Sequence, residues 1–159
     1  MGFVYCNPNP IQNIVGDCVI RGIAILSERD WDSVYMDIAY RGLLMKDMPS
    51  SNRVWGAYLS DEGYLRKVIP NTCPDCYTIS DFAYDHPHGR YLVATGTHVV
   101  GIVDGNYYDT WNSGDEVPIY YWVKETRDES VYKNASFGMG EPLSTEHVSA
   151  NTADAGKFK

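Results

Sequence analysis

The feature that most constrains the fold is an Asp-Gly pair between two apolar segments. Residues 98–103 and 106–111 are rich in Val, Ile, Tyr and Trp, and Asp104-Gly105 separates them. A tight two-residue turn needs positive φ at both central positions, which Asp and Gly adopt more readily than most residues. The pair therefore predicts a β-hairpin in which Val103 faces Asn106.

This register places a carboxylate beside a histidine. Val100 then faces Asp109, so Asp109 lies diagonal to His98 on the same face of the hairpin. A carboxylate in that position can hold one ring nitrogen of a histidine and fix its tautomer. With a three-residue loop, Asn112 would face His98 and take this role instead. Because Asp-Gly favours the shorter turn, Asp109 is the preferred partner.

The other segments divide near residue 90 into helices before and strands after. Apolar spacing and capping residues predict helices at about 17–27, from Asp30 or Asp32 to before Pro49, from Asn52 to Gly63, and from Thr78 or Ser80 to Asp85. Further strands are expected at 90–94 and 117–124, with a minor one at 64–69. This order indicates an α+β fold, with N-terminal helices packed on a C-terminal antiparallel β-sheet. Residues 125–159 are polar and are expected to form a flexible tail beyond a catalytic domain at 1–124.

Composition limits the partners of such a domain. The formal net charge of -8 argues against nucleic acid, because phosphate binding needs a basic surface. No stretch approaches the roughly 18 apolar residues of a membrane span. The first residues lack the basic start and apolar run of a signal peptide. We therefore expect a cytoplasmic protein with reduced cysteines and with neither a membrane nor a nucleic-acid partner.

Cys18 lies at the predicted start of the first helix, after Gly16-Asp17. Unpaired backbone N–H groups and the positive end of the helix dipole favour a thiolate there. Gly16 allows a tight turn, and Gly22, one turn later, is expected to leave the thiol uncovered. Gln12 precedes Cys18 by six residues, a reach from which its amide can join the Cys18 N–H in holding an oxyanion. A small buried core cysteine is the alternative interpretation of Cys18.

Together these residues predict a cysteine hydrolase that works without a cofactor. Cys18 is the expected nucleophile, His98 its base and Asp109 the residue that orients the imidazole. Gln12 is the expected oxyanion donor, with a loss on the order of a hundredfold if it is removed.

The same residues resemble the papain-like cysteine peptidases. The resemblance rests on Gln12, Gly16-Asp17-Cys18, His98 on one strand and Asp109 or Asn112 on the next, and it covers about residues 11–122. It implies a papain-like fold and a peptidase, amidase or isopeptidase acting on a peptide, a protein or another amide. Gly16-Asp17-Cys18 followed by Arg21 is also similar to the ovarian-tumour-type deubiquitinases. Residues 97–111 are similar to small bacterial and phage proteins with this core.

Two other interpretations stay open. A non-catalytic papain-fold protein of phage or bacterial origin, binding a partner, would suit the many tyrosines and the acidic surface. Cys73 and Cys76, followed by His86 and His88, form a weak zinc candidate. The two cysteines have a spacing that suits zinc, but the two histidines are closer together than in most such sites.

Overall fold

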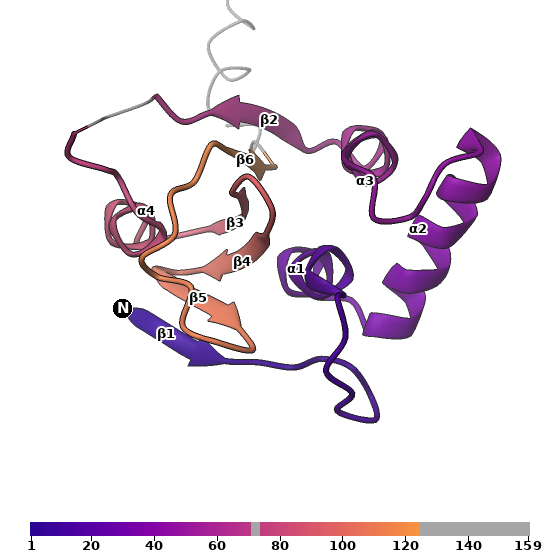
Figure 1. The fold of residues 1–159 in the computed structure, drawn as a ribbon, viewed down its shortest axis with the longest axis horizontal. Coiled ribbons are helices and arrows are strands. Elements are labelled where there is room, and N and C mark those ends of the chain that lie inside the picture. Colours follow the sequence, from indigo (N-terminus) through magenta and orange to yellow (C-terminus); the bar gives the residue numbers. More distant parts are fainter. Residues whose placement is uncertain (71–73, 125–159) are drawn as a thin grey trace, which may run out of the picture. The chain divides into compact units, whose positions relative to one another are not determined.

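The computed structural model describes residues 1–70 and 74–124, and the predicted tail at 125–159 lies outside them. The described chain has an α+β fold with four helices and six strands (Figure 1). The helices are α1 (Cys18–Ser27), α2 (Trp31–Met45), α3 (Asn52–Asp61) and α4 (Ile79–Asp85). The strands are β1 (Gly2–Tyr5), β2 (Leu65–Val68), β3 (Arg90–Ala94), β4 (Val99–Val103), β5 (Asn106–Asp109) and β6 (Tyr120–Val123). None of the helices in this part of the chain has the length and apolar character needed to cross a bilayer.

The strands form a single sheet in the order β1-β5-β4-β3-β6-β2. Val103 pairs with Asn106 in the β4–β5 hairpin, which confirms the two-residue turn. Both turn residues have positive φ, 47° at Asp104 and 75° at Gly105. The hairpin therefore has the register that was derived from the Asp-Gly pair.

The expectation of a wholly antiparallel, C-terminal sheet is wrong at one edge. β1 comes from the N-terminus and pairs in parallel with β5, so the sheet is mixed. β1 has only four residues, and three of them are exposed. Such a strand lacks the alternation of apolar and polar residues by which strands are recognised. Its place is set by pairing with a distant segment, which its own sequence does not indicate.

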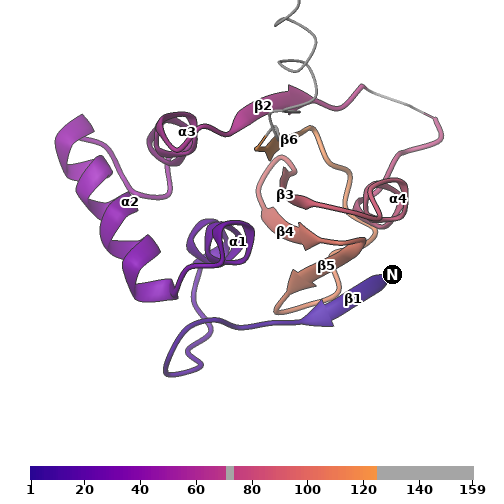
Figure 2. The same cartoon turned by 180° about the vertical axis from the view of Figure 1, so that it is seen from behind.

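Helices cover both faces of the sheet (Figures 1 and 2). α1 lies against one face with α2 on its outer side, and α3 lies on the same face beside β2 and β6. α4 lies on the opposite face. Alternate residues of β3 serve the two faces: Leu92 and Ala94 join the core on the α1 side, and Val93 joins the core on the α4 side. The central strands are thus buried on both faces, which fixes where their ends lie relative to α1.

Two glycines allow α1 to approach β4 closely. A Cβ placed on Gly101 would lie 2.9 Å from Ile25 Cβ and 3.3 Å from the carbonyl oxygen of Gly22. A Cβ on Gly22 would lie 2.5 Å from Leu92 Cδ1, so Gly22 faces the sheet. Gly22 therefore serves helix-to-sheet packing, a role that the sequence did not indicate. The close approach brings the start of α1 to the end of the sheet where β4 begins.

Replacing Gly101 with Ala should destabilise the fold. Ile25 Cβ and the Gly22 carbonyl are close to the backbone and cannot rotate away, so α1 would have to move. Overpacking of this kind costs about 1 to 3 kcal/mol in the free energy of unfolding, which urea titration followed by circular dichroism would measure.

Gly96→Ala is the matched control, because a Cβ at Gly96 meets no atom within 4 Å. We expect its free energy of unfolding to stay within about 0.5 kcal/mol of the parent value. Equal losses in the two variants would contradict the packing role of Gly101.

Candidate active site

The start of α1, the start of β4 and the end of β5 meet at one end of the sheet. Cys18 is the first residue of α1, His98 directly precedes β4, and Asp109 is the last residue of β5. The His98 backbone is held by the β3–β4 turn, since Thr95 N donates to His98 O at 2.8 Å and His98 N donates to Thr95 Oγ1 at 3.1 Å. The backbone that carries the imidazole is therefore held in place.

His98 lies between Asp109 and Cys18. Its Nε2 is 2.6 Å from Asp109 Oδ2, and its ring lies near enough to the Cys18 thiol for each group to shift the pKa of the other. Since Nε2 faces the carboxylate, Nδ1 is the nitrogen that remains for the sulfur. The imidazole thus lies between a thiol and a carboxylate, which is the order of groups that activates a nucleophile.

Asp109 is the most completely bonded group of the site. Its side chain is 1% exposed. Oδ1 accepts from Arg21 Nη2 at 3.0 Å and from Thr110 N at 2.7 Å, and Oδ2 accepts from Ser113 Oγ at 2.8 Å as well as from His98. Burial alone would raise the pKa of this carboxyl, but the hydrogen bonds from His98 and Ser113 outweigh it and lower the pKa. Asp109 is therefore a fixed negative charge behind the imidazole.

Asn112, the alternative orienting residue, serves the loop instead. Its Oδ1 accepts from the Tyr107 hydroxyl at 2.8 Å and from Gly114 N at 3.2 Å. The neighbouring Trp111 lies against the imidazole, with 5.4 Å between the ring centroids of Trp111 and His98. This indole, which is 46% exposed, shields one side of the His98 ring from water.

The thiol and the imidazole shift each other's pKa in opposite directions. Burial would raise the pKa of Cys18, but hydrogen bonds from His98 and from the Val99 backbone, together with the charges of His98 and Arg21, lower it. Burial would likewise lower the pKa of His98, but its hydrogen bonds with Asp109 and Cys18 raise the pKa to about 9. A lowered thiol pKa beside a raised imidazole pKa favours a thiolate–imidazolium pair.

Arg21 is a member of the site whose role the sequence did not indicate. It is only 5% exposed, and its guanidinium bonds Asp17 Oδ1 and Asp109 Oδ1, each at 3.0 Å. Asp17 Oδ2 also accepts from Trp31 Nε1 at 2.9 Å. Asp17 and Arg21 are one helical turn apart, a spacing at which opposite charges can pair, so the sequence indicates the contact between them. The contacts of Arg21 with Asp109 and of Asp17 with Trp31 have no local signal.

Gln12 is placed differently from its predicted role. It lies in the loop before α1 with a φ of 57°, and its amide nitrogen donates to the carbonyl oxygens of Asn7 at 3.0 Å and Asn9 at 3.1 Å. An amide has two N–H bonds, and both are used by these carbonyls. In this arrangement Gln12 holds its own loop together, and neither N–H is available for an oxyanion beside Cys18.

The zinc candidate is only partly within the described chain. Cys73 lies outside it, and Cys76 is exposed. His86 stacks on Phe82, with ring centroids 3.9 Å apart, and its Nδ1 is 2.8 Å from the Phe82 carbonyl oxygen. Within residues 1–70 and 74–124, no group of three or more His, Cys, Asp or Glu side chains is arranged to hold a metal ion.

The opposite pKa shifts of two thiols give a pH-dependence that can be measured. The pKa of Cys18 is lowered, whereas burial raises the pKa of Cys6 and the charge of Arg21 only partly offsets it. Only the thiolate is alkylated, so the iodoacetamide rate at Cys18 should reach half its plateau below pH ~8.5, the ordinary thiol value. The rate at Cys6 should reach half its plateau above that pH. Mass spectrometry of quenched samples reports both rates at once.

His98→Gln should move the Cys18 midpoint to higher pH, because the thiolate loses its hydrogen-bonded cation. His88→Gln makes the same change at an exposed histidine and should leave the midpoint unmoved. A Cys18 midpoint at or above that of Cys6 in the parent protein would contradict the ion pair.

Comparison with known proteins finds no matching family model, no matching curated protein and no matching solved structure. The site itself places a thiol at a helix start beside a partly buried imidazole, and this imidazole is hydrogen-bonded to an ionised carboxylate.

Proposed function

We propose that this chain is a papain-like cysteine hydrolase that cleaves a peptide or another amide through a thioester on Cys18. The observation that carries the proposal is the line from Cys18 through His98 to Asp109, with the thiol pKa lowered and the carboxylate buried and ionised. A structural cysteine in a core has no need of a hydrogen-bonded imidazole or of a lowered pKa.

The proposed reaction has two halves, acylation of Cys18 and hydrolysis of the thioester, and His98 transfers one proton in each. The Cys18 thiolate attacks the amide carbonyl, and the tetrahedral intermediate collapses as the C–N bond breaks and imidazolium His98 protonates the leaving amine. Neutral His98 then takes a proton from water, the hydroxide adds to the thioester, and the C–S bond breaks to release the acid. Asp109 keeps its charge throughout and holds Nε2, so that Nδ1 alone faces the reacting atoms.

The backbone at the start of α1 supports the oxyanion. Cys18 is the first helical residue, so its N–H has no carbonyl within the helix to bond. Asp17 occupies the N-cap position, but its side chain makes no cap hydrogen bond, because Arg21 and Trp31 hold both of its oxygens. The N–H groups of the first turn can therefore donate hydrogen bonds to a developing oxyanion, which would also lie in the positive field of the helix end.

Open space at Gly16, two residues before Cys18, supports access by a substrate. A Cβ on Gly16 would meet no atom within 4 Å, and the Cys18 residue itself is partly exposed. A carbonyl can therefore approach from the side of the 12–17 loop without a large movement of the fold.

Acylation by an activated ester tests the proposal directly. p-Nitrophenyl acetate should release nitrophenolate in a burst of about one equivalent, followed by slower turnover, and mass spectrometry should find the acetyl group on Cys18. Cys18→Ala should abolish the burst, because it removes the thiol whose pKa His98 lowers.

Cys6→Ala is the control, since Cys6 is a partly buried thiol with a raised pKa, and the burst should survive it. Equal acetylation of several cysteines, or a burst that persists without Cys18, would favour a binding protein on the same scaffold. Turnover of a peptide library, followed by mass spectrometry, would then separate peptidase from other amidase activity.

The hydrogen bonds of Gln12 lead to a separate prediction. Because both N–H bonds of its amide are used by Asn7 and Asn9, Gln12→Ala should lower the rate of Cys18 acylation by much less than the ~100-fold typical of an oxyanion donor. It should instead lower the free energy of unfolding, since the loop loses two hydrogen bonds. A hundredfold loss of the acylation rate with an unchanged free energy of unfolding would instead support Gln12 as an oxyanion donor.

A further inference from the structure

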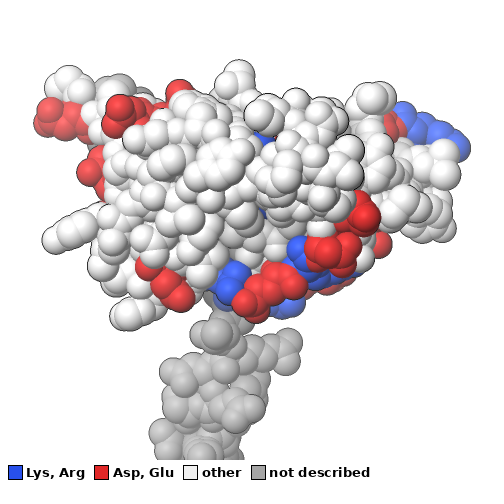
Figure 3. Space-filling model, turned by 90° about the horizontal axis from the view of Figure 1, so that it is seen from below, with Lys and Arg blue, Asp and Glu red and all other residues white. Residues whose placement is uncertain are grey.

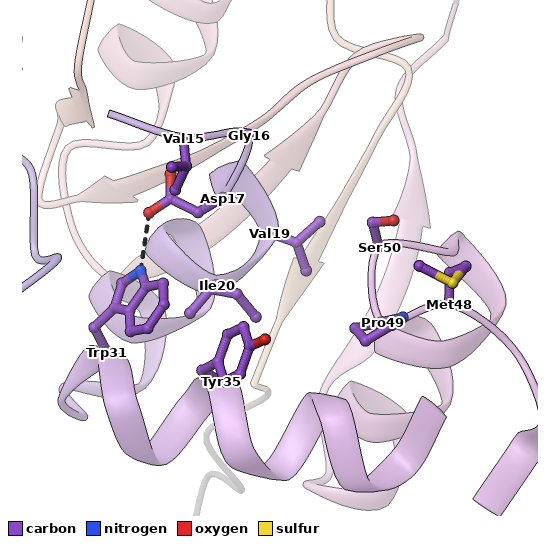
Figure 4. A pocket seen from close by; sticks show the side chains of 10 residues that line it. All are labelled: Val15, Gly16, Asp17, Val19, Ile20, Trp31, Tyr35, Met48, Pro49 and Ser50. Carbon is purple, nitrogen blue, oxygen red and sulfur yellow. Dashed lines mark hydrogen bonds between the residues drawn. The ribbon is translucent and has the colours of Figure 1, made fainter. Parts of the chain in front are cut away.

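The outer side of α2 carries apolar side chains where a surface helix usually carries charged ones. Its inner side is used by the fold, since Val34 and Ile38 are fully buried and Trp31 and Tyr35 project toward α1 (Figure 4). In the described chain no other helix or strand lies on the outer side (Figures 1 and 2). Four large apolar side chains there are between 59% and 65% exposed: Met36, Tyr40, Leu43 and Leu44. A helix that is apolar on all sides is normally buried on all sides, so a partner that covers this side is expected.

The charged side chains in the middle of α2 do not interrupt this apolar surface. Asp37 pairs with Arg29, and Arg41 pairs with Asp61 of α3. At 100° per residue, Asp37 and Arg41 lie about 140° and 180° around the helix from Asp32, away from the outer side. Charges are also grouped elsewhere, since acidic and basic side chains lie beside each other along one edge of the face seen from below and most of that face is uncharged (Figure 3).

Five residues form one stripe along the outer side of α2. Their positions, 32, 36, 39, 43 and 46, alternate by four and three, which keeps them within about 80° of one another around the helix. Asp32 lies at one end of the stripe and Lys46, the C-cap residue, at the other. Met36 and Leu43 lie between them, and Ala39 is at the centre. This is the repeat by which two helices pack side by side.

The two charged ends of the stripe select the direction of packing. Asp32 and Lys46 are exposed, and within residues 1–70 and 74–124 neither has an ion-pair partner. Each is seven positions from Ala39, so two antiparallel helices that cross at Ala39 bring Asp32 of each copy beside Lys46 of the other. A parallel pair would instead place like charges together, which is unfavourable. The small side chain of Ala39 lets the two helices approach closely.

We propose that two copies of this chain associate through the outer sides of α2, packed antiparallel about a two-fold axis at Ala39. The same stripe serves both copies, so the contact closes on itself and stops at the dimer. Met36 packs near Leu43 of the second copy, between the two pairs of opposite charges. α2 has 15 residues and is about 22 Å long, so the interface lies near the lower limit of about 1,200 Å² for specific contacts and the dissociation constant is micromolar. This association does not depend on the thiol chemistry of Cys18.

Sedimentation equilibrium of the full chain, from about 1 to 500 µM, tests the inference. A reversible monomer–dimer equilibrium is expected. Asp32→Lys and Lys46→Asp should each raise the dissociation constant at least about tenfold, because each puts like charges together at both ends of the interface. The double variant Asp32→Lys/Lys46→Asp exchanges the two charges and should return the dissociation constant to within about threefold of the parent value.

Asp115→Lys is the matched control, because it makes the same charge change at an exposed residue of the loop before β6. Its dissociation constant should stay within about twofold of the parent value. Asp32→Lys and Asp115→Lys both make the acidic chain less negative, which by itself favours association. Weaker association of Asp32→Lys alone therefore assigns the effect to its pairing with Lys46.

A second pair of variants tests the apolar part of the stripe. Leu43→Asp should leave the protein monomeric over the whole concentration range, because a carboxylate would be buried between the helices without a partner. Leu65→Asp makes the same change on β2, where Leu65 is 46% exposed, and should keep the dimer. Circular dichroism and urea titration check that each variant is folded.

The outcomes decide the inference in each case. A parent protein that stays monomeric up to the highest concentration overturns it. A dimer that Leu43→Asp leaves intact, or whose dissociation constant the charge exchange does not restore, overturns the antiparallel contact of α2. Dissociation by both single charge variants with recovery in the double variant supports it.

Discussion

The buried ion pairs of Arg21 join the start of α1 to the end of β5, the two elements that carry Cys18 and Asp109. One guanidinium bonds Asp17 at the start of α1 and Asp109 at the end of β5, each at 3.0 Å, and all three side chains are almost completely buried. Loss of one member of such a group leaves a buried charge without its partner, which typically costs about 3 to 5 kcal/mol. The geometry that aligns Cys18 with His98 is therefore fixed by a contact that neither residue makes itself.

The same ion pairs leave the N–H groups at the start of α1 without a side-chain cap. An aspartate at an N-cap usually accepts a hydrogen bond from the first turn and stabilises the helix by about 1 kcal/mol. Asp30 does this for α2, where it accepts from Ser33 N at 2.8 Å. Asp17 instead directs its carboxylate to Arg21 and Trp31. The uncapped N–H groups cost α1 some stability and leave donors beside the thiol, as expected where local stability is exchanged for a reactive site.

The sequence predicted the parts of the structure that depend on local chemistry. The Asp104-Gly105 turn set the hairpin register, and the register was enough to place Asp109 beside His98. It did not predict β1, whose strand character comes from pairing with β5, or the inward direction of Gly22, which depends on how α1 packs. The contact of Arg21 with Asp109 was missed for the same reason. Each of these three features depends on where two distant segments meet, and no periodicity within either segment reports that meeting. Gln12 is a different case, because its amide bonds the carbonyls of Asn7 and Asn9 within its own loop.

A single carboxylate connects three distant parts of the fold. Asp17 Oδ1 accepts from Arg21, whose guanidinium also bonds Asp109 at the end of β5, and Asp17 Oδ2 accepts from the indole of Trp31 at the start of α2. Movement of α2 at Trp31 would therefore act on Arg21 and Asp109 through one buried group. The position of α2 and the alignment of Cys18 with His98 thus depend on the same hydrogen-bonded network, in which the loss of one member affects the others.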